Sequence, residues 1–394
     1  MKILMLTPYL PYPLWSGGQI RTFNLLKNLA QKHDITLFSF IRNDAEKKHI
    51  RVLKKYCRDV RVFVKRPPWS FTSLLLAGSS FYPLVVCLYL NDKVKKAIED
   101  ANNQKHFHLI HAETFYVMPN IPKLNIPIIL AEQTIEYLVY KHHLDTVTNI
   151  IKKLLMVWDV TKINYWEKKF WHKAKRVIAM SKADKYLMKT KVPELKVDLV
   201  PNGVDTEFFS FRNGLRRSKI KTILFVGNFK WLQNREAVSF LLGEVWPKIK
   251  SVLKNNVRLW IVGKYPPDQI KNIGDKSVTV SDDVDDIRNA YKKADVLLAP
   301  IYGPGGTRYK ILESMAAGVP VVTTSTGIEG LNAENFVQAL IAEDARDLAT
   351  LTVKVLTDNK LYSKLAINGR KMVEGSFSWK VIAQKLDEIY RKAI

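Results

Sequence analysis

Short apolar runs alternate with segments of helical periodicity along most of the chain. The first run, Lys2–Leu6, is followed by a loop rich in proline and glycine. In the next segment, Ile20–Gln31, apolar residues such as Phe23 and Leu26 recur near every third or fourth position, as in a helix with one buried face. A second apolar run, Asp34–Phe40, completes a strand–helix–strand unit. Such a unit predicts a parallel sheet.

The same alternation continues to the end of the chain in two series. In the first half we expect strands at Lys2–Leu6, Asp34–Phe40, Val60–Val64, Phe107–Ala112, Pro127–Ala131, Arg176–Met180 and Val197–Val200. In the second half we expect them at Thr222–Gly227, Val257–Gly263, Ser277–Val280, Ala294–Pro300, Val319–Thr324 and Val337–Ala342. A turn at Pro201–Asp205 and a basic stretch at Arg212–Lys221, typical of a linker, separate the two series.

This pattern predicts an α/β protein of two doubly wound, Rossmann-like domains. We place the first domain at residues 1–205, the second at residues 206–377, and a last helix at residues 378–394. Ligands of such sheets bind at the carboxyl ends of the strands and in the cleft between domains.

Composition changes this picture mainly through charge. The 394 residues include 62 Lys and Arg against 37 Asp and Glu, a formal net charge of +25. This charge favours anionic partners: nucleic acid, acidic lipid headgroups or phosphorylated small molecules. The two cysteines, Cys57 and Cys87, provide neither a disulfide framework nor a metal site, so we expect a reducing compartment, the cytoplasm.

Two stretches raise the question of membrane contact. Phe71–Leu90 carries no charge and is long enough to span a bilayer, but Gly78 and Pro83 interrupt it. We therefore expect two short buried or interfacial helices there. Lys152–Arg176 mixes tryptophans with many lysines. It fits either a basic amphipathic helix on an anionic membrane or a helix with a buried aromatic face and solvated lysines.

The most informative stretch for chemistry is Gly303–Val322, GPGGTRYKILESMAAGVPVV. It follows the predicted strand Ala294–Pro300, begins with a glycine-rich loop, and predicts a helix that starts at Thr307 and ends at Gly318. The free N–H groups and the dipole at such a helix start favour an anion such as phosphate.

The residues around this helix start fit a diphosphate flanked by a ribose. Gly305 and Gly306 permit close backbone approach. Arg308 and Lys310 add positive charge, and Glu313 offers an acceptor for sugar hydroxyls. Two simpler interpretations stay open: the glycines form an ordinary strand–helix loop, and Lys310 and Glu313 form a surface ion pair.

Several motifs, in this order along nearly the whole chain, resemble those of the retaining GT-B glycosyltransferases of family 4, the group 1 glycosyltransferases. This family includes sucrose synthase-like and phosphatidylinositol mannosyltransferase-like enzymes. The motifs are SGGQIR (Ser16–Arg21), MSKAD (Met180–Asp184), VPNGVD (Val200–Asp205), LFVGNFKWLQNREAV (Leu224–Val238), SDDVDDIRNAYKKADVLLAP (Ser281–Pro300) and GGTRYKILE (Gly305–Glu313).

The resemblance implies a donor site in the second domain. The diphosphate would be held by Gly306, Thr307, Arg308 and Lys310, and the donor sugar would contact backbone N–H groups of Gly305 to Thr307. Lys230 and Arg235 would be further phosphate ligands, unless they belong to a solvated loop. Glu313 would bind the ribose, and the segment from Val280 to Val284 would lie beside the base. The family pattern often has a first glutamate where this chain has Gly305. A role copied from that glutamate is therefore not carried over.

The resemblance also implies residues in the first domain. Gly17 and Gly18 would approach a phosphate or the acceptor, although a structural turn needs the same glycines. His111 would contact the transferred sugar or the phosphate, unless Glu113 occupies that place. With Arg308 and Lys310, His111 completes the predicted catalytic set. The last helix would cross back to the first domain.

The implied function is metal-independent transfer of a sugar from a nucleoside diphosphate sugar to a glycan or lipid-linked acceptor, as in polysaccharide biosynthesis. No cofactor beyond the donor substrate is expected. We interpret the acids of Asp282–Asp286 as helix caps rather than metal ligands. An anionic membrane surface is a candidate partner, and nucleic acid is not expected. The alternatives are a GT-B sugar-nucleotide epimerase, a basic nucleic-acid-binding protein and a non-catalytic scaffold.

Overall fold

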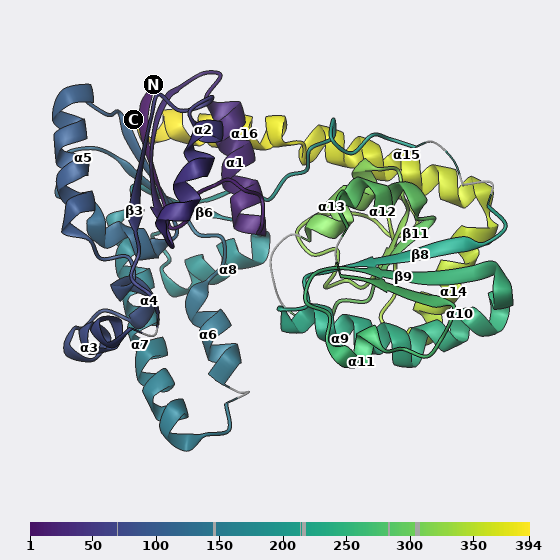
Figure 1. Ribbon diagram of the computed structural model, residues 1–394. Coiled ribbons are helices and arrows are strands. Elements are labelled where there is room, and N and C mark those ends of the chain that lie inside the picture. Colours follow the sequence, from purple (N-terminus) through teal and green to yellow (C-terminus); the bar gives the residue numbers. More distant parts are fainter. Residues whose placement is uncertain (69, 145–146, 213, 215–217, 283, 304–307) are drawn as a thin grey trace. The chain divides into compact units, whose positions relative to one another are not determined.

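The computed structural model describes the chain except at residues 69, 145–146, 213, 215–217, 283 and 304–307. The described residues form two compact units, residues 1–201 with 382–394, and residues 202–381 (Figure 1). The basic stretch that we expected to be a linker does not begin as one. The Arg212 guanidinium donates hydrogen bonds of 2.8 Å to the carbonyls of Lys292 and Ala294 inside the second unit.

The first unit is built on seven parallel strands in the order β3-β2-β1-β4-β5-β6-β7. These are β1 (Lys2–Thr7), β2 (Asp34–Ile41), β3 (Asp59–Val64), β4 (Leu109–Glu113), β5 (Ile128–Ala131), β6 (Arg176–Ala179) and β7 (Val197–Leu199). All seven predicted strands of this half are confirmed. The chain first builds outward from β1 to β3 and then returns to place β4 against β1, so the strand order reverses between β1 and β4.

Helices cover both faces of this sheet, which explains why almost every residue of β1 and β2 is buried. They are α1 (Gly17–Leu29), α2 (Ile50–Leu53), α3 (Phe71–Ser79), α4 (Leu84–Cys87), α5 (Asp92–Lys105), α6 (Glu136–Leu144), α7 (Ile150–Lys173), α8 (Lys182–Lys191) and α16 (Trp379–Ala393), with 3-10 turns η1 (Asp44–His49) and η2 (Phe115–Asn120). Figure 1 shows α5 on one face, and α1 with α16 on the other.

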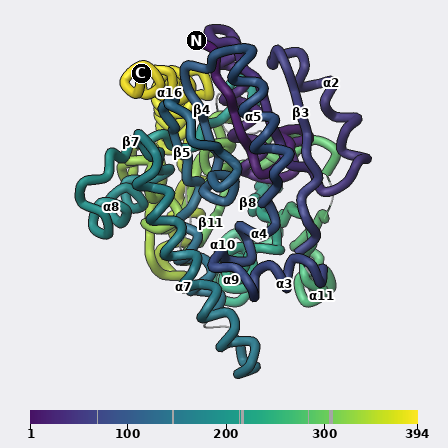
Figure 2. Tube along the Cα trace, turned by 90° about the vertical axis from the view of Figure 1, so that its left-hand side faces the viewer, coloured from purple at the N-terminus to yellow at the C-terminus, as the bar shows by residue number. Residues whose placement is uncertain are grey.

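The uncharged stretch forms two short helices, α3 and α4, as predicted, with the break at Ser80–Pro83. None of the described helices combines the length and apolar character that a bilayer span requires. Figures 1 and 2 both show α7 extending away from the sheet of the first unit. Its first residues, from Ile150 to Asp159, are all at least partly exposed, and its buried residues begin at Val160.

The second unit has six parallel strands in the order β10-β9-β8-β11-β12-β13. These are β8 (Lys221–Val226), β9 (Val257–Val262), β10 (Val278–Ser281), β11 (Val296–Ala299), β12 (Val321–Thr323) and β13 (Leu340–Ile341). All six predicted strands are confirmed. Here the strand order reverses between β8 and β11.

The helices of the second unit again lie on both faces of the sheet (Figure 1). They are α9 (Leu232–Phe240), α10 (Trp246–Leu253), α11 (Asp268–Lys271), α12 (Ile287–Lys293), α13 (Tyr309–Ala316), α14 (Ala345–Thr357) and α15 (Asn359–Ser376). A π-helical segment, η3 (Leu241–Val245), joins α9 to α10, and a 3-10 turn, η4 (Lys254–Asn256), follows α10.

Helix α13 is terminated by Gly318, as the sequence predicted. Gly318 has a φ of +72°, a left-handed conformation that glycine adopts without a side-chain penalty. Its N–H donates to the carbonyl of Met315, and the next N–H, of Val319, donates to the carbonyl of Ser314. This pair of bonds is the Schellman arrangement, which satisfies the last carbonyls of a helix. This cap ends α13 at the glycine that the sequence predicted as its stop.

Candidate active site

The second unit brings Lys310 to the point where its strand order reverses. Lys310 lies in the first turn of α13, which follows β11, while Phe225 is in β8 and Asn234 is in α9. The Lys310 Nζ donates a hydrogen bond of 2.7 Å to Asn234 Oδ1 and lies 4.6 Å from the centre of the Phe225 ring. Ligands of open α/β sheets bind at this reversal point, beyond the carboxyl ends of the strands.

The positive charge of Lys310 is only partly offset by the negative charge of Glu313. Burial, helped by the neighbouring Arg308 charge and opposed by Glu313, lowers the pKa of Lys310 to about 7. Arg308 lies directly before α13, and its guanidinium donates a hydrogen bond of 2.7 Å to the Gly303 carbonyl. Burial also lowers the pKa of Arg308. Two desolvated cations side by side are a site at which a bound anion would be stabilised.

Glu313, one turn later on α13, is held by a tyrosine. The Tyr291 hydroxyl, on α12, donates a hydrogen bond of 2.8 Å to Glu313 Oε2. Burial raises the pKa of Glu313, and the hydrogen bond from Tyr291 and the charge of Lys310 partly offset this. Because Lys310 bonds Asn234 and Glu313 bonds Tyr291, the interpretation of these two residues as a surface ion pair is wrong. A carboxylate has several acceptor positions, so Glu313 can bind further hydroxyls.

The other predicted donor-site residues lie along the same sheet edge. Lys230 and Arg235 are exposed on the segment after β8, and the Lys230 ammonium lies 3.9 Å from the centre of the Tyr265 ring. Val280 is near the carboxyl end of β10, and Val284 follows it, partly buried against the core of this unit. The predicted residues Gly305, Gly306 and Thr307 lie outside the described residues.

The predicted capping role of the acids after β10 is confirmed for Asp286. Its side chain is the N-cap of α12 and accepts a hydrogen bond from the Arg288 N–H. The Arg288 guanidinium also binds this carboxylate. These hydrogen bonds, opposed by slight burial, lower the pKa of Asp286. The acid is therefore used in the structure of the helix.

The first unit places a buried polar network at its own reversal point, between β1 and β4. His111, on β4, is fully buried, and its Nε2 lies 3.1 Å from Glu113 Oε1. Its Nδ1 lies 2.8 Å from the hydroxyl of Tyr390, on α16. Burial raises the pKa of Glu113, but hydrogen bonding and charge from His111, Arg21 and Gln133 outweigh this and lower it. The ionised Glu113 therefore accepts a hydrogen bond from His111 Nε2, and the Tyr390 hydroxyl bonds the other ring nitrogen.

The network continues from Glu113 to the glycine loop. Gln133 donates a hydrogen bond of 2.9 Å to Glu113 Oε2 and another to the Tyr9 hydroxyl. A Cβ on Gly18 would lie 2.5 Å from both the Gln133 and the Tyr9 side chains. Gly18 therefore has a packing reason to be glycine, whatever it binds. Gly17 starts α1, which Ser16 caps.

In this structure His111 has both ring nitrogens engaged by side chains of the first unit. Its predicted contact with the sugar or phosphate stays a prediction. Arg21, on α1, is buried and donates to the carbonyls of Val200 and Pro201 at 2.9 and 2.8 Å. It attaches the end of the first unit to α1.

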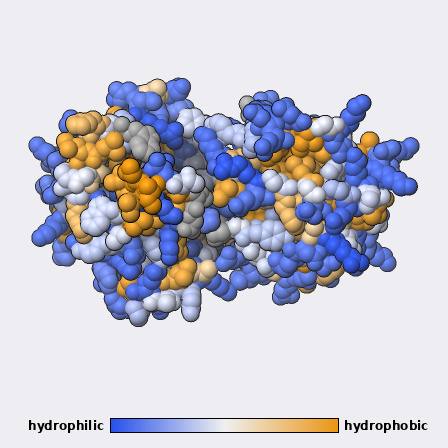
Figure 3. Space-filling model, turned by 90° about the horizontal axis from the view of Figure 1, so that it is seen from below, coloured by the Kyte–Doolittle hydropathy of each residue, from blue (hydrophilic) through white to orange (hydrophobic). Residues whose placement is uncertain are grey.

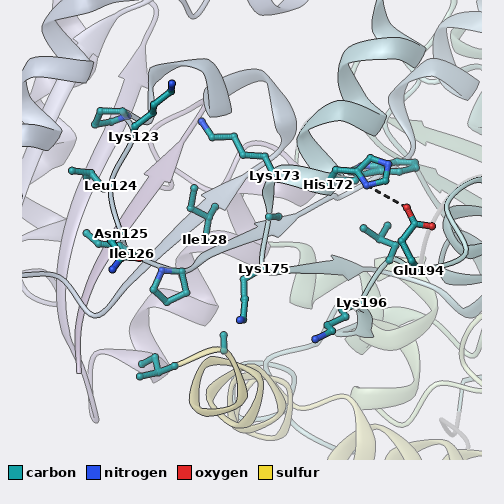
Figure 4. A pocket seen from close by; sticks show the side chains of 17 residues that line it. Lys123, Leu124, Asn125, Ile126, Ile128, His172, Lys173, Lys175, Glu194 and Lys196 are labelled. Carbon is teal, nitrogen blue, oxygen red and sulfur yellow. Dashed lines mark ion pairs between the residues drawn. The ribbon is translucent and has the colours of Figure 1, made fainter.

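Two hollows of the first unit lie at opposite edges of its sheet. The larger, of about 1010 Å³, is lined by Lys123, Lys173, Lys175 and Lys196 and by the ion pair of His172 with Glu194 (Figure 4). These residues precede or begin β5, β6 and β7, so this hollow is at the amino ends of the strands. It is not at the edge where ligands of such sheets bind.

The smaller hollow, of about 100 Å³, is at the carboxyl ends of β1, β2 and β3. Its lining includes Trp15 of the glycine loop, Arg42, Lys65 and Tyr89. The Lys65 Nζ donates to the Tyr89 hydroxyl at 3.3 Å, and burial, with the Arg42 charge, lowers the pKa of Lys65. An exposed indole beside two cations can bind a sugar ring that carries an anionic group.

Sequence reasoning missed Asn234, Tyr291, Gln133 and Tyr390. Each of them lies in a different segment of the chain from the residue to which it is hydrogen-bonded. Tyr291 could have been found, because it lies within the motif Ser281–Pro300 on which the family resemblance rests.

Family models match both halves of the chain. The family model described as Glycosyltransferase Family 4 matches residues 15–208, and that described as Glycosyl transferases group 1 matches residues 220–358. An uncharacterized 44.6 kDa protein from the cps region of Klebsiella pneumoniae is 21% identical over 97% of both chains. A phosphatidyl-myo-inositol mannosyltransferase of Mycobacterium leprae is 28% identical over 48% of this chain and 52% of its own, so this match spans about half of that relative.

Solved structures share the fold over the whole chain. Sucrose-phosphate synthase from Thermosynechococcus elongatus has a TM-score of 0.71 at 18% identity and covers 100% of this chain and 99% of its own. HepE of Anabaena, solved with UDP and glucose, has a TM-score of 0.64 at 18% identity and covers both chains completely. The two parallel Rossmann-like sheets are thus those of the GT-B fold, and the chain belongs to the group 1 glycosyltransferases.

Proposed function

We propose that the chain transfers a sugar, with retention of its anomeric configuration and without a metal ion, from a nucleoside diphosphate sugar to a glycan or lipid-linked acceptor. The observation that carries this proposal is the pair of desolvated cations, Arg308 and Lys310, at the reversal point of the second sheet. The retaining stereochemistry comes from the family resemblance.

Sugar transfer breaks the bond between the anomeric carbon and the diphosphate and forms a bond to an acceptor oxygen. Negative charge develops on the departing diphosphate. Lys310 and Arg308 would stabilise that charge from a partly buried position, where electrostatic interactions are stronger than in water. This supply of positive charge is the reason for proposing that no metal ion is needed. Glu313, fixed by Tyr291, would bind the ribose hydroxyls.

The acceptor is proposed to bind the first unit in the hollow at the carboxyl ends of β1, β2 and β3. Arg42 and Lys65 favour an acceptor with a phosphate or carboxylate, and Trp15, 58% exposed, offers a surface for a sugar ring. A second structure of HepE holds UDP-glucose, which supports a nucleotide-sugar donor, and the lipid in the mannosyltransferase's name supports a lipid acceptor. The reaction would take place in the cytoplasm.

Release of the nucleoside diphosphate tests this function. The protein is incubated with UDP-, GDP-, ADP- and TDP-sugars and a mixture of phosphorylated glycan acceptors, with and without EDTA. We expect release with one nucleotide family, unchanged by EDTA and at least tenfold slower in Lys310→Met. Release that EDTA abolishes would contradict metal independence, and equal release in Lys310→Met would contradict the assigned site. The anomeric configuration of the product, read by NMR, tests retention.

A further inference from the structure

Hydrophobic side chains gather on one surface of the first unit. Of the 25 large hydrophobic side chains that are exposed in the described part of the chain, 12 belong to α3, Phe81, α6 and α7. Figure 3, seen from below, shows orange side chains over this part of the first unit. The six that define what we call the α3–α7 surface are Phe71, Leu75, Ile151, Leu154, Leu155 and Trp158.

More than half of the surface of each of these side chains is exposed to solvent. Phe71 is 79% exposed, Ile151 69% and Leu155 68%. The first ten residues of α7 contribute no buried side chain, although seven of them are apolar. Exposing such a stretch to water is unfavourable, and an apolar surface of this kind marks an interaction site.

The two parts of the surface are held together by specific bonds. The buried Lys162 of α7 donates hydrogen bonds to the carbonyls of Ala77, in α3, and Tyr82, at 2.8 and 3.1 Å. The Trp166 indole of α7 donates to the Phe81 carbonyl at 2.8 Å. Lys162 thus satisfies the carboxyl end of α3 and fixes it against the middle of α7.

The charge of α7 is predominantly positive. Helix α7 carries six lysines and two acids. Both acids are engaged inside the unit: Asp159 Oδ1 accepts from the Leu84 N–H, and Glu167 accepts from the N–H groups of Glu136 and Tyr137. Lys152 and Lys153 alternate with the exposed apolar residues, and a lysine stem can lie on apolar surface while its ammonium reaches a polar layer.

We propose that the α3–α7 surface docks on an anionic lipid bilayer. Its apolar side chains would enter the interface, and the lysines would meet acidic headgroups. An aromatic residue such as Trp158 favours the same interfacial depth. A second copy of the chain is a poor occupant, because it would oppose lysines with lysines. This proposal concerns the partner of the first unit and does not depend on which nucleotide sugar the second unit binds.

The test is flotation of the full chain with liposomes of equal parts phosphatidylglycerol and phosphatidylcholine, or of phosphatidylcholine alone. We expect the wild type to bind the anionic liposomes and to bind the neutral ones at least tenfold more weakly. Leu154→Glu with Leu155→Glu should lower binding to anionic liposomes at least tenfold. Val252→Glu, an equally exposed apolar position on α10, is the matched control and should bind as the wild type does.

Several results would overturn this assignment. Wild-type protein that stays unbound with both liposomes, or a double variant that binds as well as the wild type, excludes a bilayer as the occupant. Dimers that dissociate in the double variant, without liposome binding, would assign the surface to self-association. Because the substituted side chains are exposed, the double variant should keep the wild-type melting temperature. Retained nucleotide-sugar binding separates the outcome from that of the proposed transferase activity.

Discussion

Lys310 gives the sharpest quantitative prediction for the donor site. Its pKa of about 7 in the free protein means that roughly nine tenths of the side chain is protonated at pH 6 and roughly a tenth at pH 8. A bound diphosphate would favour the ammonium form, so binding at pH 8 should be accompanied by uptake of nearly one proton. The two phosphates of a nucleotide sugar are both esterified and do not titrate in this range.

The effect on affinity follows from the fraction of protein that is ready to bind. If only the ammonium form binds the diphosphate, the Kd should rise about tenfold between pH 6 and pH 8. Replacing the side chain in Lys310→Met removes the charge at every pH. We expect its Kd to be about 30-fold higher than that of the wild type at pH 6, or about 2 kcal/mol, and nearly independent of pH.

Titration calorimetry measures both quantities. At pH 8, two buffers with different ionisation enthalpies give the number of protons taken up with the nucleotide sugar that the protein binds best. Lys248→Met, which removes an exposed lysine from α10, is the control and should behave as the wild type does. A wild-type Kd that is the same at pH 6 and pH 8, with no proton uptake, would refute the reasoning. A pH-dependent Kd in Lys310→Met would refute the assignment to this residue.

Three further predictions concern groups beside the sites. Tyr291→Phe removes the hydrogen bond to Glu313 and should weaken nucleotide-sugar binding about three- to tenfold by calorimetry, whereas an unchanged Kd would contradict a role in holding Glu313. Tyr390→Phe removes the hydrogen bond to His111 and should lower the free energy of unfolding by about 1 kcal/mol in a urea titration; no loss would mean the buried network is not stabilising. Burial raises the pKa of Glu167 to about 8, so the stability that its protonated form provides is lost as pH rises through that value. The melting temperature of Glu167→Gln relative to that of the wild type should therefore increase from pH 5.5 to pH 8.5. A difference that stays constant with pH would contradict the raised pKa.

The strands and the donor helix were predictable because they depend on local patterns. Most strands are short apolar runs bounded by turn residues, and those in the middle of each sheet, such as β4 and β11, are buried because helices cover both faces. The helix after β11 carries its own stop signal in Gly318. The chemistry proposed for Arg308, Lys310 and Glu313 could be predicted because these residues share one helix start.

The partners of these residues could not be predicted, because they come from distant parts of the chain. Asn234, which binds Lys310, is 76 residues away, and Tyr390, which binds His111, is 279 residues away. The linker prediction at Arg212 failed for the same reason. Its place in a basic stretch suggested a linker, but its guanidinium completes hydrogen bonds to carbonyls about 80 residues further along. Only packing determines such pairs.

The central claim is that the second unit binds a nucleoside diphosphate sugar through the residues at the start of α13. Thermal melting against a panel of UDP, GDP, ADP, TDP and CMP sugars, on the wild type and on Glu313→Ala, tests it most directly. We predict that one diphosphate family raises the melting temperature, that EDTA leaves this shift unchanged, and that Glu313→Ala loses it. A wild type that melts at the same temperature with every nucleotide sugar would contradict the claim.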